Sequence, residues 1–307
     1  MEDLANLYKK QILDTPRQKV LITGGTGYLG SHFINKFYNK YDFIILKRST
    51  SDIAKIDSKN KNLIFYDLDK VILKEIFEKN KIDIIFHCAT NYGRSDLNTL
   101  NILDCNLTLP VSLLQLSKKF NIKCFINTDT ILDKGVSHYA LSKSHFNEWL
   151  KIFSNEISCI NVRLEHFYGP NDDDTKFVTK ILKLLISNVN TIDLTKGEQI
   201  RYFLHIQDVI DAFDIIISNI AKIGSGYHNI DLGSSQGISI KDITNILKKL
   251  TNNEVTELKF GALSYRNNEV MNPNLDLFLI KELGWHTKIK LEDGLKNIID
   301  YEKMNLK

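Results

Sequence analysis

Residues 20–30 read Val-Leu-Ile-Thr-Gly-Gly-Thr-Gly-Tyr-Leu-Gly, a short apolar run followed directly by a glycine-rich turn. Gly24 permits a tight turn, Gly27 allows the backbone to approach a pyrophosphate, and Gly30 lets a following helix pack closely on the strand. The free N–H groups at the start of such a helix attract phosphate oxygens. A P-loop is excluded because Ser31, and not lysine, follows Gly30. The stretch therefore predicts a dinucleotide-binding turn, which also contains Thr26, Tyr28 and Leu29.

Apolar runs alternate with helical patterns through the first half of the chain. Strands are predicted at residues 19–23, 42–47, 62–66, 83–88, 123–128 and 158–163, and helices at 30–39, 71–79, 106–119 and 139–153. This alternation is typical of βαβ units in a parallel sheet that helices cover on both faces. The predicted class is α/β: a Rossmann-type doubly wound parallel sheet with a smaller α/β C-terminal substrate lobe.

The alternation ends near residue 165, where Gly, Asn and Asp clusters begin to interrupt the helices and short strands. We expect residues 1–165 and part of 200–232 to form the dinucleotide-binding domain. Residues 166–199 and 233–307 are expected to form the substrate lobe. No low-complexity linker separates the two parts, so we expect them to share one cleft.

The 307 residues carry a formal net charge of +3, and the basic residues are scattered along the chain. A nucleic-acid partner is therefore not expected. No apolar run approaches the roughly 20 residues needed to cross a bilayer, and the amino terminus lacks a signal-peptide core. We therefore expect a cytoplasmic protein without a membrane partner. The four cysteines show no Cys-x-x-Cys spacing, so neither a metal site nor a disulfide framework is predicted.

The end of the second predicted strand bears on the choice of cofactor. It reads Leu46-Lys47-Arg48-Ser49. An acidic residue at this point would bind the ribose hydroxyls of NAD, whereas an arginine beside a hydroxyl suits the 2′-phosphate of NADP. Lys47, Arg48 and Ser49 therefore predict NADP(H). The alternative is that the strand simply ends in a solvated basic segment.

Tyr139 and Lys143 lie four residues apart, so they share one face of the predicted helix. A free tyrosine has a pKa of about 10, and a nearby ammonium lowers it by favouring the phenolate. Such a phenol can give a proton to a carbonyl oxygen or take one from a hydroxyl. The pair predicts a nicotinamide-dependent enzyme that acts on an alcohol or ketone. The alternative is a Tyr–Lys pair without function on an exposed helix.

Further motifs follow in the order found in the extended short-chain dehydrogenases/reductases that modify nucleotide sugars, and the chain resembles that family over nearly its whole length. The matching segments are Asp67-Leu68, Asp83 to Thr90, Asn106, Arg163-Leu164 with Tyr168-Gly169-Pro170, Gly197 to Val209, Leu283-Gly284-Trp285 and Leu291 to Leu295. The resemblance implies a cofactor site that includes Asp67 and Leu68 at the adenine, together with Cys88, Ala89, Thr90 and Asn106.

The resemblance also implies the remaining site residues and the assembly. The family has a third catalytic group, a Ser or Thr after the fifth strand. Thr128 is its counterpart, with Thr130 as the alternative if the alignment shifts by two residues. Arg201 is implied as a contact of the nucleotide-sugar diphosphate, and Arg266 in the second lobe is a further candidate for that contact. The helix that carries Tyr139 commonly pairs across a dimer in this family, so a homodimer is expected.

The same segment distinguishes among the reactions of the family. Its 4,6-dehydratases carry Thr-Asp-Glu where this chain has Thr128-Asp129-Thr130, so the missing glutamate disfavours dehydration. The chain is most similar to the NADPH-dependent 4-keto reductases of the CDP-paratose and CDP-abequose synthase type. The resemblance therefore implies reduction of the C4 keto group of a CDP- or dTDP-linked deoxy sugar for surface polysaccharides. A nucleotide-sugar 4-epimerase with retained NAD and a non-catalytic NADP(H)-binding protein are the alternatives.

Overall fold

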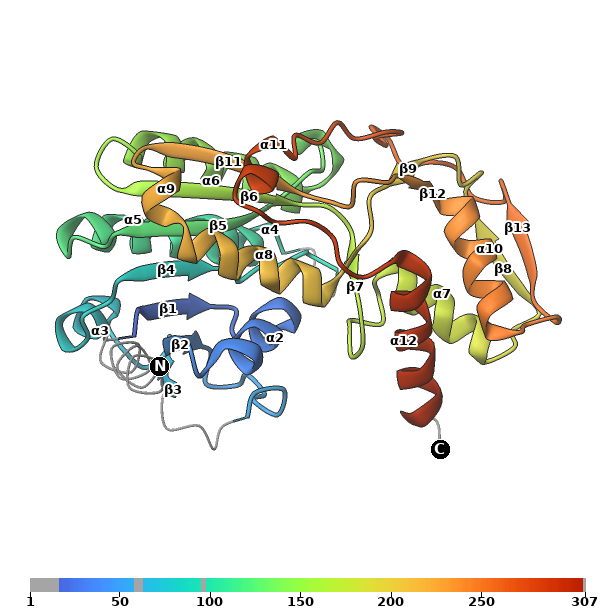
Figure 1. Cartoon of the computed structure of the whole chain (residues 1–307), viewed down its shortest axis with the longest axis horizontal. Helices are drawn as coiled ribbons and strands as arrows, with labels where there is room; N and C mark the ends of the chain where they lie inside the picture. The colour runs from blue at the N-terminus through green and yellow to red at the C-terminus, as the bar shows by residue number, and fades with distance from the viewer. Residues whose placement is uncertain (1–16, 58–62, 95–97, 306–307) are drawn as a thin grey trace, which may run out of the picture.

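The computed structural model describes residues 17–57, 63–94 and 98–305. Seven strands form its central sheet in the order β11-β6-β5-β4-β1-β2-β3, and every pairing is parallel (Figure 1). Their bounds are β1 Lys19–Thr23, β2 Asp42–Lys47, β3 Leu63–Asp67, β4 Ile84–His87, β5 Cys124–Thr130, β6 Ser158–Leu164 and β11 Tyr227–Leu232. The strand order reverses between β1 and β4, where a doubly wound sheet leaves a crevice for a dinucleotide. The predicted fold class is confirmed.

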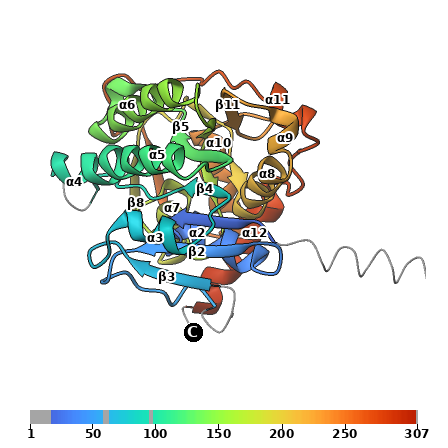
Figure 2. The same ribbon diagram turned by 90° about the vertical axis from the view of Figure 1, so that its left-hand side faces the viewer.

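Helices cover both faces of the sheet (Figure 2). One face carries α2 (Tyr28–Phe37), α8 (Ile206–Ser218), α9 (Ile220–Ile223) and α11 (Phe278–Glu282), and the other carries α3 (Leu73–Lys79), α5 (Leu109–Lys119) and α6 (His138–Phe153). Successive residues of a strand point to opposite faces, so Val20 and Ile22 enter one core while Leu21 enters the other. The strands are apolar on both faces because both are covered.

One predicted helix begins earlier than its apolar pattern indicates. Helical structure runs from Thr99 as α4 (Thr99–Leu103), continues through a π-helical turn (Asp104–Thr108) and then becomes α5. Pro110 has no N–H to donate to the carbonyl of Asn106, four residues earlier, which accounts for the widened turn at this point. Asn106 therefore lies in the middle of a helical segment and not at its start.

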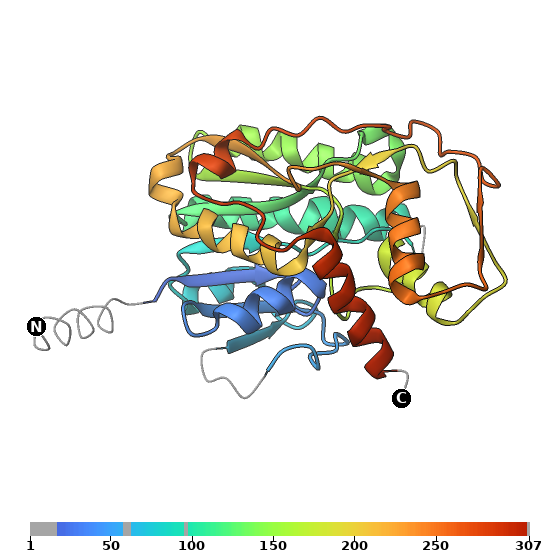
Figure 3. The same ribbon diagram turned by 45° about the vertical axis from the view of Figure 1, so that its right-hand side comes forward.

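A smaller lobe lies beyond the carboxyl ends of the central strands (Figure 1). It contains α7 (Phe177–Ile186), α10 (Ile240–Thr251) and α12 (Leu291–Asn305), which share a third apolar core (Figure 3). Three short two-stranded sheets complete this part of the chain: β7 (Phe167–Tyr168) with β10 (Leu204–His205), β8 (Thr191–Leu194) with β13 (Glu257–Phe260), and β9 (Ile200–Arg201) with β12 (Ile238–Ser239). No helix in the described ranges is long and apolar enough to cross a membrane.

The chain returns from the smaller lobe to the large sheet before it enters α12. Ile280, Leu283 and Trp285 lie in the same core as α8 and β11. The sequence-based boundary assigned all of 233–307 to the substrate lobe, whereas these apolar side chains pack on the sheet. Helix α11, which carries Ile280, lies against β11, the outermost strand of the sheet.

Asp208 joins α8 to the segment that leads into α12. Its side chain is buried, and its two carboxylate oxygens accept hydrogen bonds from the backbone N–H groups of Lys288 and Ile289, each at 3.1 Å. The indole N–H of Trp285 donates to the Asp208 carbonyl oxygen at 3.0 Å. Two motifs that lie far apart in the sequence, one ending at Val209 and one at Trp285, therefore meet at a structural joint.

Replacing Asp208 by alanine should lower the free energy of unfolding by about 2–4 kcal/mol, because two backbone N–H groups lose a charged acceptor. Urea unfolding followed by the fluorescence of buried Trp285 measures this change. Glu78→Ala, which removes only an exposed ion pair with Lys74, should leave the transition nearly unchanged. Equal midpoints for the two variants would contradict the assigned role of Asp208.

Candidate active site

The glycine-rich turn closes tightly between β1 and α2. Gly24 has a φ of +70°, and a Cβ placed on it would lie 2.5 Å from the backbone nitrogen of Ala89. A Cβ on Gly30 would overlap the carbonyl oxygen of Gly24. Helix α2 begins at Tyr28, directly after Gly27, so its first N–H groups are free at the carboxyl edge of the sheet. This cradle excludes side chains and fits a pyrophosphate.

Thr26, Tyr28 and Leu29 complete the turn, and the side chains of Tyr28 and Leu29 point away from a bound phosphate. The Tyr28 ring turns inward and stacks on Phe167, with ring centroids 6.1 Å apart. The Leu29 side chain is part of the core, and Thr26 is half-buried. Tyr28 and Leu29 therefore offer backbone N–H groups to a cofactor, while their side chains hold α2 against the sheet.

The ends of β2 and β3 bring basic and acidic groups together. Lys47 forms an ion pair with Asp67 at 2.5 Å, and hydrogen bonds from Lys47 and Lys70 lower the pKa of Asp67. The Ser49 hydroxyl donates to Asp69 at 2.5 Å. Arg48 is exposed, and within the described structure its side chain makes no hydrogen bond or ion pair. Of the two basic residues at the end of β2, Lys47 is paired with Asp67, whereas the guanidinium of Arg48 can contact a ligand. Asp69, beside Ser49, is an acidic neighbour that was not predicted from the sequence.

The loop after β4 lies against the glycine-rich turn. The Cys88 thiol donates to the Thr23 carbonyl oxygen at 3.0 Å, and the Ala89 N–H donates to the Thr23 hydroxyl at 3.3 Å. His87 is fully buried with Nδ1 at 2.7 Å from the same hydroxyl, and burial holds its pKa well below the usual value. His87 is therefore a neutral core residue. The Cys88–Ala89–Thr90 loop is close enough to the cradle to border a bound dinucleotide.

Asn106 is fully buried and its amide is used within the protein. Its Oδ1 accepts the Asn91 N–H at 2.8 Å, and its Nδ2 donates to the Asn91 carbonyl at 2.9 Å and to the Ser142 hydroxyl at 3.0 Å. These contacts tie the loop after β4 to α6. The arrangement fits a residue that positions the cofactor loop rather than one that touches the cofactor.

Tyr139 and Lys143 share the inner face of α6, whose first turn is capped by Ser137. Lys143 is buried, and its ammonium donates to the Thr128 carbonyl oxygen at 2.8 Å. Burial lowers the pKa of Lys143, and the nearby charge of Asp129 opposes that shift. Burial raises the pKa of Tyr139 well above its ordinary value, so the phenol holds its proton at neutral pH. Desolvation outweighs the lowering that the sequence predicted for this pair.

The two threonines of β5 take different positions. Thr128 is buried, and its hydroxyl donates to the His87 carbonyl oxygen at 3.3 Å. The Thr130 side chain partly opposes the rise that burial causes in the pKa of Tyr139. Both residues point to the same face of the strand, but Thr128 lies one pleat deeper. Of the two threonines, Thr130, the alternative in the sequence analysis, is the one whose side chain affects the pKa of Tyr139.

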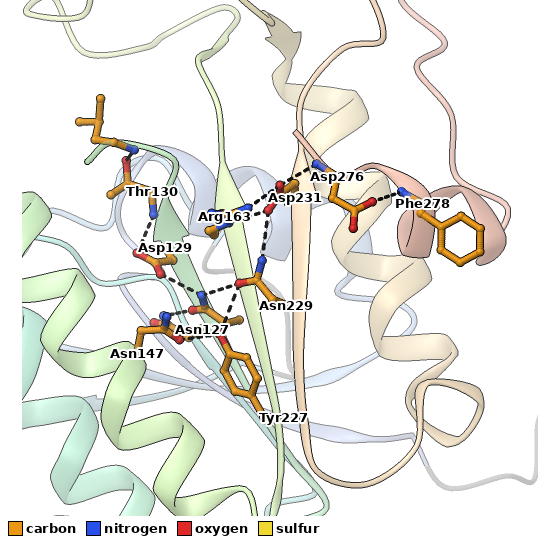
Figure 4. A network of polar contacts seen from close by, with 12 residues as sticks. Asn127, Asp129, Thr130, Asn147, Arg163, Tyr227, Asn229, Asp231, Asp276 and Phe278 are labelled. Atoms are coloured by element: carbon orange, nitrogen blue, oxygen red, sulfur yellow. Dashed lines mark hydrogen bonds and ion pairs between the residues drawn. The ribbon is translucent and has the colours of Figure 1, made fainter. Parts of the chain in front are cut away.

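A polar pocket of about 410 Å³ opens beside Thr130, between the end of β5, α6 and the segment 270–274. Its polar lining comes from carboxylate, amide, hydroxyl and basic side chains: Asp129, Asp133, Lys134, Ser144, Asn147, Arg163, Asn272 and Asn274. Figure 4 shows several of these residues joined by hydrogen bonds across neighbouring strands. Such a lining can accept and donate hydrogen bonds to a ligand rich in hydroxyl groups.

The two arginines implied in substrate binding meet at one carboxylate. Arg201 is buried, and its guanidinium contacts Glu269 and the carbonyl oxygens of Ile200 and Val270. Arg266 is exposed and reaches Glu269 at 2.9 Å. Arg201 therefore fixes the segment around Glu269, whereas Arg266 pairs with the same carboxylate from the protein surface. Glu269 was not predicted from the sequence, because the matching motif, Gly197 to Val209, contains Arg201 but does not extend to Glu269.

Comparisons with known proteins agree with this geometry. Residues 20–233 match the model of the NAD dependent epimerase/dehydratase family. CDP-abequose synthase from Salmonella muenchen is 30% identical over 296 residues, which cover 93% of this chain and 98% of that protein. UDP-glucose 4-epimerase from Thermotoga maritima has the same fold, with a TM-score of 0.82, 24% identity, and 94% and 100% of the two chains covered.

UDP-glucose 4-epimerase from Thermus thermophilus, solved in complex with NAD, also shares the fold, with a TM-score of 0.76, 16% identity, and 93% and 99% of the two chains covered. The glycine cradle, the Tyr139–Lys143 pair and the family match extend over the same part of the chain. The chain therefore belongs to the NAD-dependent epimerase/dehydratase family, the extended short-chain dehydrogenases/reductases that modify nucleotide sugars.

Proposed function

We propose that this protein is an NADPH-dependent reductase of the C4 keto group of a nucleotide-activated deoxy sugar. The observation that carries the proposal is the Tyr139–Lys143 pair on α6, with the buried Lys143 ammonium held by the Thr128 carbonyl oxygen at 2.8 Å. A keto reduction ends with a proton given to the new alkoxide, which requires a phenol that holds its proton.

Each residue of the site has a role in this reaction. When bound, NADPH supplies the hydride. The Thr130 hydroxyl oxygen accepts the Leu132 N–H at 3.2 Å, and its proton would be donated to the substrate carbonyl. Tyr139 then gives its proton to the C4 oxygen. Lys143, held by the Thr128 carbonyl, would supply positive charge to the forming alkoxide and to the nicotinamide ribose.

Dehydration is disfavoured by the residues at the end of β5. The resemblance places an aspartate and a glutamate directly after the catalytic threonine of the dehydratases. The corresponding segment here is Thr128-Asp129-Thr130, which keeps the aspartate but lacks the glutamate.

The substrate proposal rests on the relatives and on the polar pocket. The Salmonella relative is named CDP-abequose synthase, which favours a CDP-linked sugar, with a dTDP-linked sugar as the next choice. The pocket beside Thr130 would hold the sugar. Arg266 would meet the diphosphate directly, and Arg201 would act through Glu269. On this proposal the product enters surface-polysaccharide biosynthesis in the cytoplasm.

The cofactor proposal assigns the glycine cradle and the loop after β4 to NADP(H), with Arg48 at the 2′-phosphate and Asp67 and Leu68 at the adenine. Asp69 beside Ser49 supports the competing assignment of NAD, because a carboxylate there suits ribose hydroxyls and repels a phosphate. A 4-epimerase with retained NAD is therefore the second candidate. It predicts that Arg48 has no part in cofactor binding.

A homodimer is also proposed. Helix α6 exposes Leu141, Trp149 and Ile152, although its inner face is buried. Apolar side chains gathered on one exposed helix face are typical of an interface between subunits.

NADPH oxidation at 340 nm, with CDP-, dTDP-, GDP- and UDP-4-keto-6-deoxy sugars as substrates, tests the reductase. We expect turnover with one nucleotide class, and Tyr139→Phe should lower kcat about 10²- to 10⁴-fold because the proton donor is lost. The affinity for NADPH, measured by fluorescence titration, should stay unchanged in this variant. Absence of oxidation with every sugar, together with NAD bound in the purified protein, would move the epimerase to first place.

Thr130→Val should lower kcat about 10- to 100-fold, because the transition state loses a hydrogen bond to developing charge. Thr128→Val is the matched control: it removes a buried hydroxyl of the same strand but keeps the carbonyl that holds Lys143. It should change kcat less than about twofold and cost about 1 kcal/mol of stability. The reverse pattern would return the catalytic role to Thr128.

Arg48→Ala should raise the KM for NADPH about 10-fold or more, because one charge-assisted contact with the 2′-phosphate is removed. The KM for NADH should remain the same, since that cofactor has no phosphate at this position. Steady-state kinetics with both cofactors measures the difference. A variant in which neither KM changes would argue against the NADP(H) assignment.

A further inference from the structure

Tyr92, in the loop after β4, packs against the proposed proton donor. The ring centroids of Tyr92 and Tyr139 lie 4.9 Å apart, and the ring planes are inclined by 51°. This separation is within the range in which aromatic rings attract one another. Tyr92 follows β4, whereas Tyr139 is the second residue of α6, which follows β5. The contact therefore joins the loop that borders the cofactor cradle to the helix that carries the Tyr139–Lys143 pair.

The position of Tyr139 at the start of α6 leaves its ring without support from its own helix. Helical side chains lean toward the amino end of the helix and pack over the preceding turn. Tyr139 follows His138, the first residue of α6, so no earlier turn of this helix lies beneath its ring. The backbone of α6 therefore fixes the Cα of Tyr139, while other elements must set its side-chain torsions. Tyr92 supplies an aromatic surface for this purpose.

The backbone on both sides of Tyr92 is fixed by hydrogen bonds. Asn91 exchanges two bonds with the buried Asn106 amide: its N–H donates at 2.8 Å, and its carbonyl oxygen accepts at 2.9 Å. The Gly93 N–H donates to the Asn91 side-chain oxygen at 2.9 Å, and Gly93 has a φ of +67°, which closes a tight turn. Tyr92 therefore projects from a short loop in which both of its neighbours have defined positions.

Arg94 holds the Tyr92 ring, although Tyr92 is 39% exposed. The Arg94 guanidinium lies 4.6 Å from the centroid of the Tyr92 ring, a distance typical of a cation–π interaction. Its Nη1 donates to the Thr175 hydroxyl at 2.9 Å, in the segment between β7 and α7. That hydroxyl donates in turn to Asp173 at 2.6 Å, so the guanidinium has a fixed acceptor. The Tyr92 ring is thus held by Arg94 as well as by Tyr139.

We infer that Tyr92 is a positioning residue, whose ring holds the Tyr139 phenol in the direction required for proton transfer. The inference rests on the proposed function, in which Tyr139 gives its proton to the substrate oxygen. Proton transfer needs donor and acceptor at hydrogen-bond distance, so a small displacement of the phenol lowers the rate steeply. Both contacts of Tyr92 use its ring, so the role requires an aromatic side chain and not a hydroxyl. Tyr92 acts through Tyr139 and not on the substrate.

Tyr92→Ala removes the ring, whereas Tyr92→Phe keeps it. In the NADPH oxidation assay, kcat of Tyr92→Ala should fall about 10- to 100-fold because the phenol is misplaced, while both KM values change less than about twofold. Tyr92→Phe should keep kcat within about twofold of the wild type, because the ring contact remains. An unchanged kcat in Tyr92→Ala, or an equal loss in both variants, would overturn the inference.

Phe120→Ala is the matched control. Phe120 lies at the carboxyl end of α5, and its ring pairs with Phe77 at a centroid distance of 5.5 Å with the Lys119 ammonium 6.0 Å away. The variant therefore removes one ring of an aromatic pair with a nearby cation, but on α5 and not in the loop after β4. It should lower the urea midpoint and keep kcat within about twofold. A loss of kcat equal to that of Tyr92→Ala would assign the effect to general destabilisation.

A double-mutant cycle with Tyr139→Phe shows whether Tyr92 acts through Tyr139. The Tyr139→Phe variant has no phenolic proton to place, so Tyr92→Ala should have almost no effect on the residual kcat in this background. An effect of the same size in both backgrounds would show that Tyr92 acts directly on substrate or cofactor, and would overturn the positioning role.

Failure of the reductase assignment is distinguishable from failure of this inference, because the ring position can be measured without turnover. In protein labelled with fluorotyrosine, the fluorine NMR line that disappears in Tyr139→Phe belongs to Tyr139. This line should be narrow in the wild type and in Tyr92→Phe, and should shift and broaden in Tyr92→Ala as the ring samples several positions. An unchanged line in Tyr92→Ala would overturn the inference. A displaced line without turnover in the wild type would support the ring contact and count against the reductase alone.

Discussion

The close approach of Gly24 to the backbone of Ala89 is the constraint on which the rest of the site depends. The two residues follow β1 and β4, the adjacent central strands at which the strand order reverses. With no Cβ between them, the turn, the first N–H groups of α2 and the loop after β4 can border one crevice. Thr23 adds a polar link, because its hydroxyl contacts both His87 and Ala89. Any side chain at Gly24 would separate the cofactor cradle from the loop that Asn106 ties to α6.

Burial determines the chemistry of the groups beside this crevice. Tyr139 and Lys143 lie on the inner face of α6, where desolvation raises the pKa of the phenol and lowers that of the ammonium. Desolvation disfavours the charged form of each group, so a protonated phenol is the resting state. This state suits the delivery of a proton to an alkoxide. The buried carboxylate of Asp129 acts against the loss of the ammonium proton, so the end of β5 is part of the electrostatics of the site.

The positions of the charged side chains in the smaller lobe depend on how this lobe packs against the sheet. Asp208 and Trp285 join α8 to the segment before α12, so the C-terminal helix has a defined position relative to the sheet. On the other side, Glu269 gathers Arg201 and Arg266 at one point, which leaves one arginine buried and one exposed. A carboxylate that compensates a buried guanidinium allows the second guanidinium to face a ligand without like-charge repulsion.

The sequence by itself determined the parallel sheet, the glycine cradle and the shared helix face of Tyr139 and Lys143. These features depend on residues that are close in the sequence. Side chains alternate between the two faces of a strand, side chains about 3.6 residues apart share a helix face, and neighbouring glycines close a turn. Only the tertiary structure decided that the Thr128 hydroxyl meets the His87 carbonyl, that Asp69 lies at Ser49, and that Arg163 binds Asp231 in place of Asp129. Such pairings follow from strand order, register and depth below the sheet edge. These are set by the packing of the whole chain, and no local spacing encodes them.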